Sequence, residues 1–263
     1  MVNFLSESDA QKQGLAYVND AGNFVMAVDS TNPVGANGNR NSVRIFSPNP
    51  YNTGLFIADI KHMPVGCSVW PAYWTVGPNW PSGGEIDVLE GVHNQYGNQM
   101  TLHTSPSPGC QAANNVPATA RLATQQCAVL NGDNTGCAFV SDDGSSYGTG
   151  FNNVGGGVYA HQWTASAIKI WFFPRSQIPQ DIYQETPNPS GWGEPDATWS
   201  ANSCDIGSHF SDHVITFDIT LCGDWAGATF NSAGCPGTCA QFVANPDNFK
   251  NAFWEVQGVR VYQ

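Results

Sequence analysis

The sequence predicts an all-β protein: a β-jelly-roll sandwich of two antiparallel sheets with long, disulfide-pinned loops. Short segments with alternating apolar and polar residues recur along the chain, and 28 Gly and 17 Pro provide turns between them. Eight cysteines form an even set without zinc-finger spacing, which indicates disulfides. The 263 residues contain no internal repeat or linker, so we expect one domain over residues 1–263.

The clearest strand covers 54–62, where Leu55, Ile57 and Asp59 fall on one face. Similar patterns predict further strands over 14–18, 23–29, 42–47, 68–76, 99–104, 166–173, 213–222 and 252–262. Helical patterns are scarce, and the best one covers 239–244 and stops near Pro246. A further helical turn is expected over 247–251.

Residues 105–157 are rich in Gly, Asn, Ser and Cys and show little periodicity. We expect long surface loops here rather than a linker, because a flexible linker would hardly carry three cysteines. The pairing of the eight cysteines stays open, since sequence alone does not give disulfide connectivity.

Composition narrows the possible partners. Only 11% of the residues are charged and the net charge is −12, which argues against nucleic acid or an anionic membrane. Nine tryptophans offer flat surfaces on which neutral sugar rings can stack. The cysteines indicate an oxidising, extracellular compartment, although the first residues lack the pattern of a signal peptide.

Three carboxylates stand close together in the segment Gly-Gly-Glu85-Ile-Asp87-Val-Leu-Glu90-Gly. Glu85 and Asp87 share a strand face by period two, whereas the next position on that face is Leu89. One extra residue, inserted as a β-bulge, would return Glu90 to the face of the other two. We therefore predict a bulged strand with an acidic face.

The spacing indicates a reaction type. Four regular strand steps cover about 13 Å, and inward-leaning glutamates at the two ends would bring their carboxyls to roughly 5–6 Å. A retaining glycosidase needs about 5–5.5 Å, and an inverting enzyme needs about 6.5–9.5 Å. The alternative is an acidic edge strand that deters aggregation. The flanking glycines and nearby tryptophans favour the catalytic interpretation.

The acidic segment resembles the bulged active-site signature of glycoside hydrolase family 16, the laminarinase and lichenase β-glucanases with a jelly-roll fold. The fungal endo-β-1,3(4)-glucanase branch is similar along essentially the whole chain. The segments that carry this resemblance begin at Arg40, His62, Trp70, Thr101, Trp171, Cys204, Cys222 and Val259.

The resemblance implies that Glu85 is the nucleophile and Glu90 the general acid/base, with Asp87 between them. One carboxylate must be ionised to attack the anomeric carbon, and the other must hold a proton for the leaving oxygen. An acid between them can share hydrogen bonds and help keep a proton on a neighbour. No cofactor and no catalytic metal are expected.

Candidate substrate-binding residues follow from the same resemblance: Arg44, Trp74, Trp80, His103 and Trp225. The alternative for each tryptophan is core packing, which we prefer for Trp171 inside its hydrophobic strand. For His103 the alternative is a structural strand histidine, and for Arg44 it is a strand-edge charge.

The sequence thus predicts a secreted, monomeric, retaining endo-β-glucanase that hydrolyses β-1,3 or β-1,4 bonds of β-1,3- and mixed-linkage β-1,3/1,4-glucans. The alternatives are a transglycosylase of the same fold and a non-catalytic β-glucan-binding protein. A serine hydrolase is disfavoured because no Gly-x-Ser-x-Gly elbow occurs. Relatives carry a strand upstream of the position that matches Val2, and we expect this chain to lack it.

Overall fold

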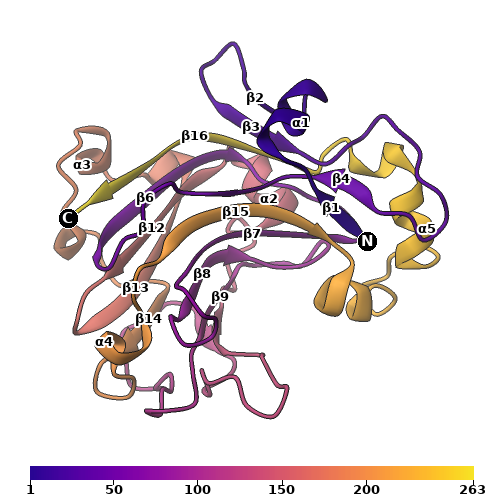
Figure 1. Cartoon of the computed structure of the whole chain (residues 1–263). Helices are drawn as coiled ribbons and strands as arrows, with labels where there is room; N and C mark the ends of the chain where they lie inside the picture. Colours follow the sequence, from indigo (N-terminus) through magenta and orange to yellow (C-terminus); the bar gives the residue numbers. More distant parts are fainter.

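A computed structural model describes all residues, 1–263, and consists of two stacked antiparallel sheets (Figure 1). We name them the cleft sheet and the outer sheet. The cleft sheet has, in spatial order, β10 (Arg121–Leu122), β11 (Cys137–Val140), β9 (Gln99–His103), β8 (Glu85–Glu90), β7 (Val69–Val76), β15 (Val214–Leu221) and β5 (Arg44–Phe46). The predicted jelly-roll sandwich is confirmed.

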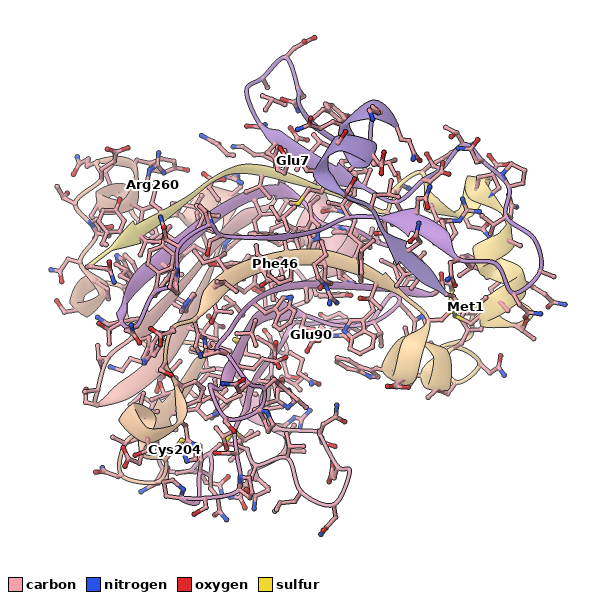
Figure 2. All side chains as sticks on the ribbon, viewed as in Figure 1. Met1, Glu7, Phe46, Glu90, Cys204 and Arg260 are labelled. Carbon is pink, nitrogen blue, oxygen red and sulfur yellow. A yellow bond between two sulfur atoms is a disulfide. The ribbon has the colours of Figure 1, made fainter.

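The outer sheet also has seven strands: β14 (Ala197–Ser200), β13 (Ala167–Pro174), β12 (Gly157–Trp163), β6 (Gly54–His62), β16 (Phe253–Tyr262), β3 (Phe24–Ala27) and β2 (Ala16–Val18). A separate parallel pair joins β1 (Val2–Phe4) to β4 (Arg40–Ser42). Figure 2 shows Arg260 on β16 of the outer sheet and Glu90 on the cleft sheet.

Aromatic side chains fill the space between the sheets. Tyr73 of β7 stacks on Phe217 of β15 with ring centroids 4.6 Å apart. Trp254, from the outer sheet, meets Phe217 edge-on at 5.4 Å and donates its indole N–H to the backbone carbonyl of Asp218 at 2.9 Å. Buried aromatic surface therefore fixes β15 against the outer sheet, and the opposite face of the cleft sheet stays free for a site.

The helices are short and lie in the connections. The α-helices are α1 (Glu7–Lys12), α2 (Gly148–Asn153), α3 (Gln180–Tyr183), α4 (Ile206–His209) and α5 (Cys239–Ala244). The 3₁₀ turns are η1 (Arg175–Gln177), η2 (Pro189–Gly191) and η4 (Pro246–Phe249), and η3 (Gly223–Gly227) is a π-helical turn. None of the helices combines the length and apolar character needed to cross a bilayer.

The predicted helix at 239–244 is confirmed, and a capping box between Thr238 and Gln241 begins it. The turn expected over 247–251 is the 3₁₀ turn η4. Helix α1 was not predicted, although its signal is present: the Ser6 side chain accepts a 3.2 Å hydrogen bond from the backbone N–H of Asp9.

Two expectations were wrong in part. Residues 105–157, expected to be loops, also contain β10, β11 and α2. The four-residue strand β11 was not predicted because it is almost entirely buried and so shows no alternation of apolar and polar residues. The strand expected over 42–47 is two strands, since Val43 separates β4, paired with β1, from β5 in the cleft sheet. Strands β12 and β14 were missed for the same reason as β11.

Four disulfides join all eight cysteines, as expected: Cys67–Cys235, Cys110–Cys204, Cys127–Cys137 and Cys222–Cys239. Two of them hold the 105–157 segment, because Cys110 bonds to the distant Cys204 and the Cys127–Cys137 bridge closes a local loop. The Cys222–Cys239 bridge fixes the start of η3 to the start of α5.

Candidate active site

The predicted bulge in β8 is confirmed. On β7, Trp74 pairs with Asp87 while its neighbour Tyr73 pairs with Leu89, so Val88 is the extra residue. The side chains of Val88 and Leu89 are both fully buried. The bulge therefore turns two successive apolar side chains inward and returns Glu90 to the face that Glu85 and Asp87 occupy.

Asn98 supports the backbone of the bulge. Its Oδ1 accepts a 2.9 Å hydrogen bond from the backbone N–H of Glu90, and its Nδ2 donates at 2.8 Å to the carbonyl of Val88. A bulge leaves such groups without partners in the ladder, and leaving them unpaired in the interior costs free energy. The buried amide of Asn98 replaces the missing ladder bonds and so fixes the direction of Glu90.

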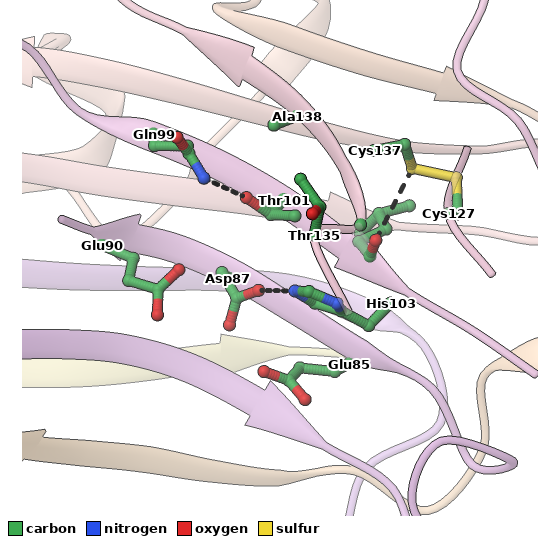
Figure 3. Close-up of polar contacts among 12 residues, drawn as sticks. Glu85, Asp87, Glu90, Gln99, Thr101, His103, Cys127, Thr135, Cys137 and Ala138 are labelled. Carbon is green, nitrogen blue, oxygen red and sulfur yellow. Dashed lines mark hydrogen bonds and ion pairs between the residues drawn. A yellow bond between two sulfur atoms is a disulfide. The ribbon is translucent and has the colours of Figure 1, made fainter. Parts of the chain in front are cut away.

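Glu85 and Glu90 line a cleft of about 500 Å³, and Figure 3 shows Asp87 between them. Its lining residues are Trp70, Trp80, Glu85, Glu90, Gln99, His103, Asn134, Thr135, Asp224 and Trp225. A smaller pocket of about 200 Å³ adjoins it across Trp70, Glu85 and Glu90. That pocket is also lined by Arg44, Ala72, Trp74, Asp87, Asp218 and Thr220. All eight residues predicted for the site therefore lie around one continuous cleft.

Glu85 and Glu90 each accept a hydrogen bond from a tryptophan, and Asp87 lies beside a histidine. The indole N–H of Trp80 hydrogen-bonds to Glu85, and Trp70 Nε1 donates to Glu90 Oε1 at 2.8 Å. His103 Nε2 lies 3.3 Å from Asp87 Oδ2, as Figure 3 shows. His103 reaches this position because it pairs with Glu85 across the β8–β9 ladder.

Burial raises the pKa of all three acids. Desolvation, with the nearby charge of Asp87, raises the pKa of Glu85 to about 8, and His103 and Trp80 oppose the shift. Desolvation raises the pKa of Glu90 to about 7, opposed chiefly by the hydrogen bond from Trp70. Desolvation and the charge of Glu90 raise the pKa of Asp87 well above its usual range. Near neutral pH the cluster therefore retains at least one shared proton.

The ligand atoms of Glu85, Asp87 and His103 lie within 4.8 Å of one another, and these residue types can bind cations. The contacts of Glu85 with Trp80 and of Asp87 with His103, together with the raised pKa values of both acids, instead suit a cluster that holds and transfers protons. Two carboxyls flanking a cleft, one ionised and one protonated, can attack a carbon centre and protonate its leaving group.

The tryptophans predicted to line the cleft do so, and the one predicted to lie in the core is buried. Trp80 is 44% exposed beside Glu85, and Trp225 meets Trp70 edge-on in the cleft with ring centroids 5.8 Å apart. Trp74 lines the adjoining pocket and donates to Asp218 Oδ2 at 3.3 Å. Trp171 is buried at 3% exposure, which confirms its expected place in the interior.

Sequence reasoning missed several cleft residues, chiefly Trp70 and Asp218 and also Gln99, Asn134, Thr135 and Asp224. It also missed Asn98, which supports the bulge. Trp70 had a usable signal, since it shares the strand face of Trp74 by period two. Asp218 also had one, because it is the only charged residue in the apolar strand β15. The loop residues had no local signal.

A family model described as the XgeA-like, catalytic GH16 domain matches residues 1–262. The chain belongs to glycoside hydrolase family 16. Family membership agrees with the resemblance carried by the acidic segment, and it fits the bulged strand, the two-sheet sandwich and the disulfide-rich loops described above.

Curated relatives in the family match the whole chain. A probable glycosidase of Schizosaccharomyces pombe is 43% identical over 266 residues, and the endo-1,3(4)-β-glucanase xgeA of Emericella nidulans is 40% identical over 273 residues. Each match covers 100% of this chain, but only 62% and 43% of those relatives. The chain thus spans roughly half the length of these two relatives.

Two solved family 16 structures match over 100% of this chain and 90% of theirs, each at 42% identity. One, with a TM-score of 0.95, is Laminarinase 16A from Phanerochaete chrysosporium, with 6-O-glucosyl-laminaritriose in both donor and acceptor sites. The other, with a TM-score of 0.93, is an elongating β-1,3-glucosyltransferase. A glycoside hydrolase fold of this type therefore supports both hydrolysis and chain elongation.

Proposed function

We propose that this chain is a retaining endo-β-glucanase that cleaves internal β-1,3 or β-1,4 bonds of β-1,3- and mixed-linkage β-1,3/1,4-glucans. The observation that carries the proposal is that Glu85 and Glu90 lie on one face of β8, on either side of the Val88 bulge, in a cleft lined by tryptophans. The names of the relatives support the substrate class.

In the first step a carboxylate oxygen of Glu85 attacks the anomeric carbon. The bond from that carbon to the glycosidic oxygen breaks, and the oxygen takes the proton of Glu90 as it leaves. In the second step Glu90, now ionised, accepts a proton from a water molecule. The water oxygen attacks the same carbon and displaces Glu85, so two inversions give net retention.

These roles require the shared proton to reside on Glu90 when the substrate is in place. In the empty cleft Glu85 has the higher pKa of the two, about 8 against about 7. A sugar hydroxyl that donates to Glu85 adds to the Trp80 hydrogen bond and favours the ionised form. Asp87, between the two glutamates, passes the proton that Glu85 gives up on to Glu90, and the carboxylate of Asp87 is left ionised beside His103.

The test is digestion of laminarin, lichenan and carboxymethyl cellulose, followed by NMR assignment of the product linkages and of the anomeric configuration first released. We expect β-configured oligosaccharides of several lengths. First-formed α-anomers would refute retention, and the release of glucose alone would refute endo action. The pattern across the three glucans identifies the preferred linkage.

A transglycosylase is the second candidate, and the match to an elongating β-1,3-glucosyltransferase favours it. The glycosyl-enzyme intermediate is the same, but a sugar hydroxyl attacks it in place of water. Products longer than the starting laminari-oligosaccharide, measured by mass spectrometry at several substrate concentrations, identify this activity. A non-catalytic β-glucan-binding role would have no use for the paired acids, and it predicts binding without products.

The four disulfides support a secreted protein, as the sequence predicts. We also propose that the chain works as a monomer, because Glu85, Glu90 and the predicted sugar-stacking tryptophans already meet in one cleft without a residue from a second copy. Sedimentation at micromolar concentration tests this.

A further inference from the structure

Asp218 is a buried acid on β15 that lies outside the acidic segment of β8. It pairs with Arg44 on one side and with Ala72 on the other, and Ala72 pairs in turn with Glu90. Side chains at paired positions share a face, and neighbouring strands are about 4.8 Å apart. Asp218 therefore lies two strands, roughly 10 Å, from Glu90, with only the methyl group of Ala72 between them.

One oxygen of Asp218 fixes two cleft side chains. Asp218 Oδ2 accepts hydrogen bonds from Arg44 Nε at 2.8 Å and from Trp74 Nε1 at 3.3 Å. The Asp218 side chain is only 4% exposed, so water competes weakly for these bonds. The indole of Trp254 anchors the backbone carbonyl of the same residue, so the acceptor itself is rigidly placed.

Arg44 is held on its faces as well as at Nε. Its guanidinium carbon lies 4.4 Å from the ring centroid of Phe4 and 5.7 Å from that of Trp74. Only Nε of the guanidinium has an acceptor within the protein, so Nη1 and Nη2 are free to donate. The side chain is one-third exposed and lines the smaller pocket. A guanidinium held in this way is preorganised to bind hydroxyl groups.

Ala72 provides the space for a ligand. It lies between Trp70 and Trp74 on the same strand face, and these three residues line the pocket together with Arg44 and Asp218. Indole rings accept the apolar face of a pyranose, and Arg44 can donate to its hydroxyls. The small side chain of Ala72 between the indole rings of Trp70 and Trp74 leaves room for one sugar unit.

We propose that Asp218 is a positioning residue of the cleft: it holds the Arg44 guanidinium and the Trp74 indole in the orientation that binds a glucosyl unit lying over Ala72. The inference rests on the proposed function, because it takes a β-glucan as the ligand. Asp218 lies outside the acidic segment of β8 and would act on the substrate through Arg44 and Trp74.

Asp218 also acts on Glu90 through its charge. Burial raises the pKa of Asp218 itself to about 6, opposed by Arg44. Above that pH its negative charge raises the pKa of Glu90. The ionisable groups around Glu90 are Glu85, Asp87, His103, Tyr147 and Asp218. Removal of the Asp218 charge therefore lowers the pKa of Glu90, which gives a readout that a purely structural residue would not produce.

The test variant is Asp218→Asn, which keeps the side-chain shape and removes the charge. In a Glu85→Gln background, calorimetry should show about tenfold weaker binding of laminarihexaose, the effect expected for weakened hydrogen bonds to a charged group. In the active enzyme KM should rise by a similar factor while kcat stays within about threefold. The basic limb of kcat/KM should move to lower pH, and cleavage positions in end-labelled laminarihexaose should shift.

The matched control is Asp59→Asn. Asp59 is also a buried acid paired with an arginine, since its Oδ1 lies 2.7 Å from Nη1 of Arg175, but it belongs to the outer sheet. This control should lower the melting temperature and leave the affinity, cleavage pattern and pH limb unchanged. A double-mutant cycle with Arg44→Ala should show that Asp218→Asn adds little once Arg44 is absent.

Wild-type affinity and cleavage pattern in Asp218→Asn would overturn the inference, as would equal losses in Asp59→Asn. If Asp218→Asn does not fold, Trp74→Phe removes one of the same two donors, and about threefold weaker binding is expected. A wild-type chain that binds laminarihexaose without cleaving it would refute the proposed function alone, because the affinity comparison still decides the role of Asp218. A chain that does not bind it would refute both.

Discussion

The indole Nε1 of Trp70 donates a 2.8 Å hydrogen bond to Oε1 of Glu90. Trp70 also lines both parts of the cleft and meets Trp225 edge-on. One side chain therefore contributes in two ways: its ring lines the cleft, and its N–H favours the ionised form of Glu90, the proposed acid/base. These contributions can be separated by substitution.

Trp70→Phe removes the N–H and keeps an aromatic ring. Because the lost hydrogen bond favours ionised Glu90, its pKa should rise, and activity that depends on protonated Glu90 should persist to higher pH. The basic limb of kcat/KM on laminarin should therefore move upward, opposite to the shift expected for Asp218→Asn. A downward or absent shift would show that Trp70 does not tune Glu90.

Glu85→Gln should abolish hydrolysis and leave oligosaccharide binding nearly intact, because the nucleophile acts only after the sugar is seated. A loss of kcat of at least about 10⁴-fold, with a laminarihexaose affinity within a few fold of wild type, is expected. Steady-state kinetics and calorimetry measure both quantities. Glu194→Gln, an exposed acid outside the cleft, is the control and should retain full activity. Turnover near wild type in Glu85→Gln would refute the nucleophile assignment.

Glu90→Gln should impair natural substrates far more than substrates with activated leaving groups. A general acid contributes about 10²–10⁴-fold when the leaving oxygen needs a proton, and little when it does not. The comparison is laminarin against a dinitrophenyl laminari-oligosaccharide, measured as the first-step burst. Equal losses on the two substrates would remove the acid role from Glu90.

Stability should fall as pH rises from about 6.5 to about 8. Glu85 and Glu90, with folded pKa values of about 8 and about 7 against an ordinary value of 4.5, hold protons that the unfolded chain has released. His161 and His213, with folded values of about 3 and about 4 against 6.5, have the opposite effect, and it is complete by about pH 6.5. The four shifts largely cancel between about pH 4.5 and 6.5, so the melting temperature should change little there and fall above about pH 6.5.

Calorimetric melting temperatures from pH 5 to 8.5 check this dependence. Glu85→Gln and Glu90→Gln replace costly buried charges with neutral amides, so each should raise the melting temperature at pH 8 by a few degrees and flatten the decline. Glu194→Gln should leave the curve unchanged. If the melting temperature falls equally steeply with pH in all variants, groups other than Glu85 and Glu90 cause the pH dependence.

Features that depend on the local order of residues could be predicted before the fold was known. The two-residue period of a strand places Glu85 and Asp87 together, and the mismatch at Leu89 requires a bulge, which the register between β7 and β8 confirms. Strand β16 was found, and it shows this alternation, since Trp254 and Val256 are buried while Phe253 and Glu255 are partly exposed. Strands β11, β12 and β14 are buried over nearly their whole length, so burial hides their alternation.

Contacts between distant segments could be seen only in the folded chain. The pairing of β15 with β7 brings Asp218 under Trp74, and the disulfide partners are set by the same long-range contacts. Local patterns do not encode this information, because a strand shows which face is apolar but not which strand will lie beside it. The acids proposed for catalysis were therefore readable from one segment, whereas Asp218 and Asn98, which hold other residues of the site in place, became visible only in the folded sheet.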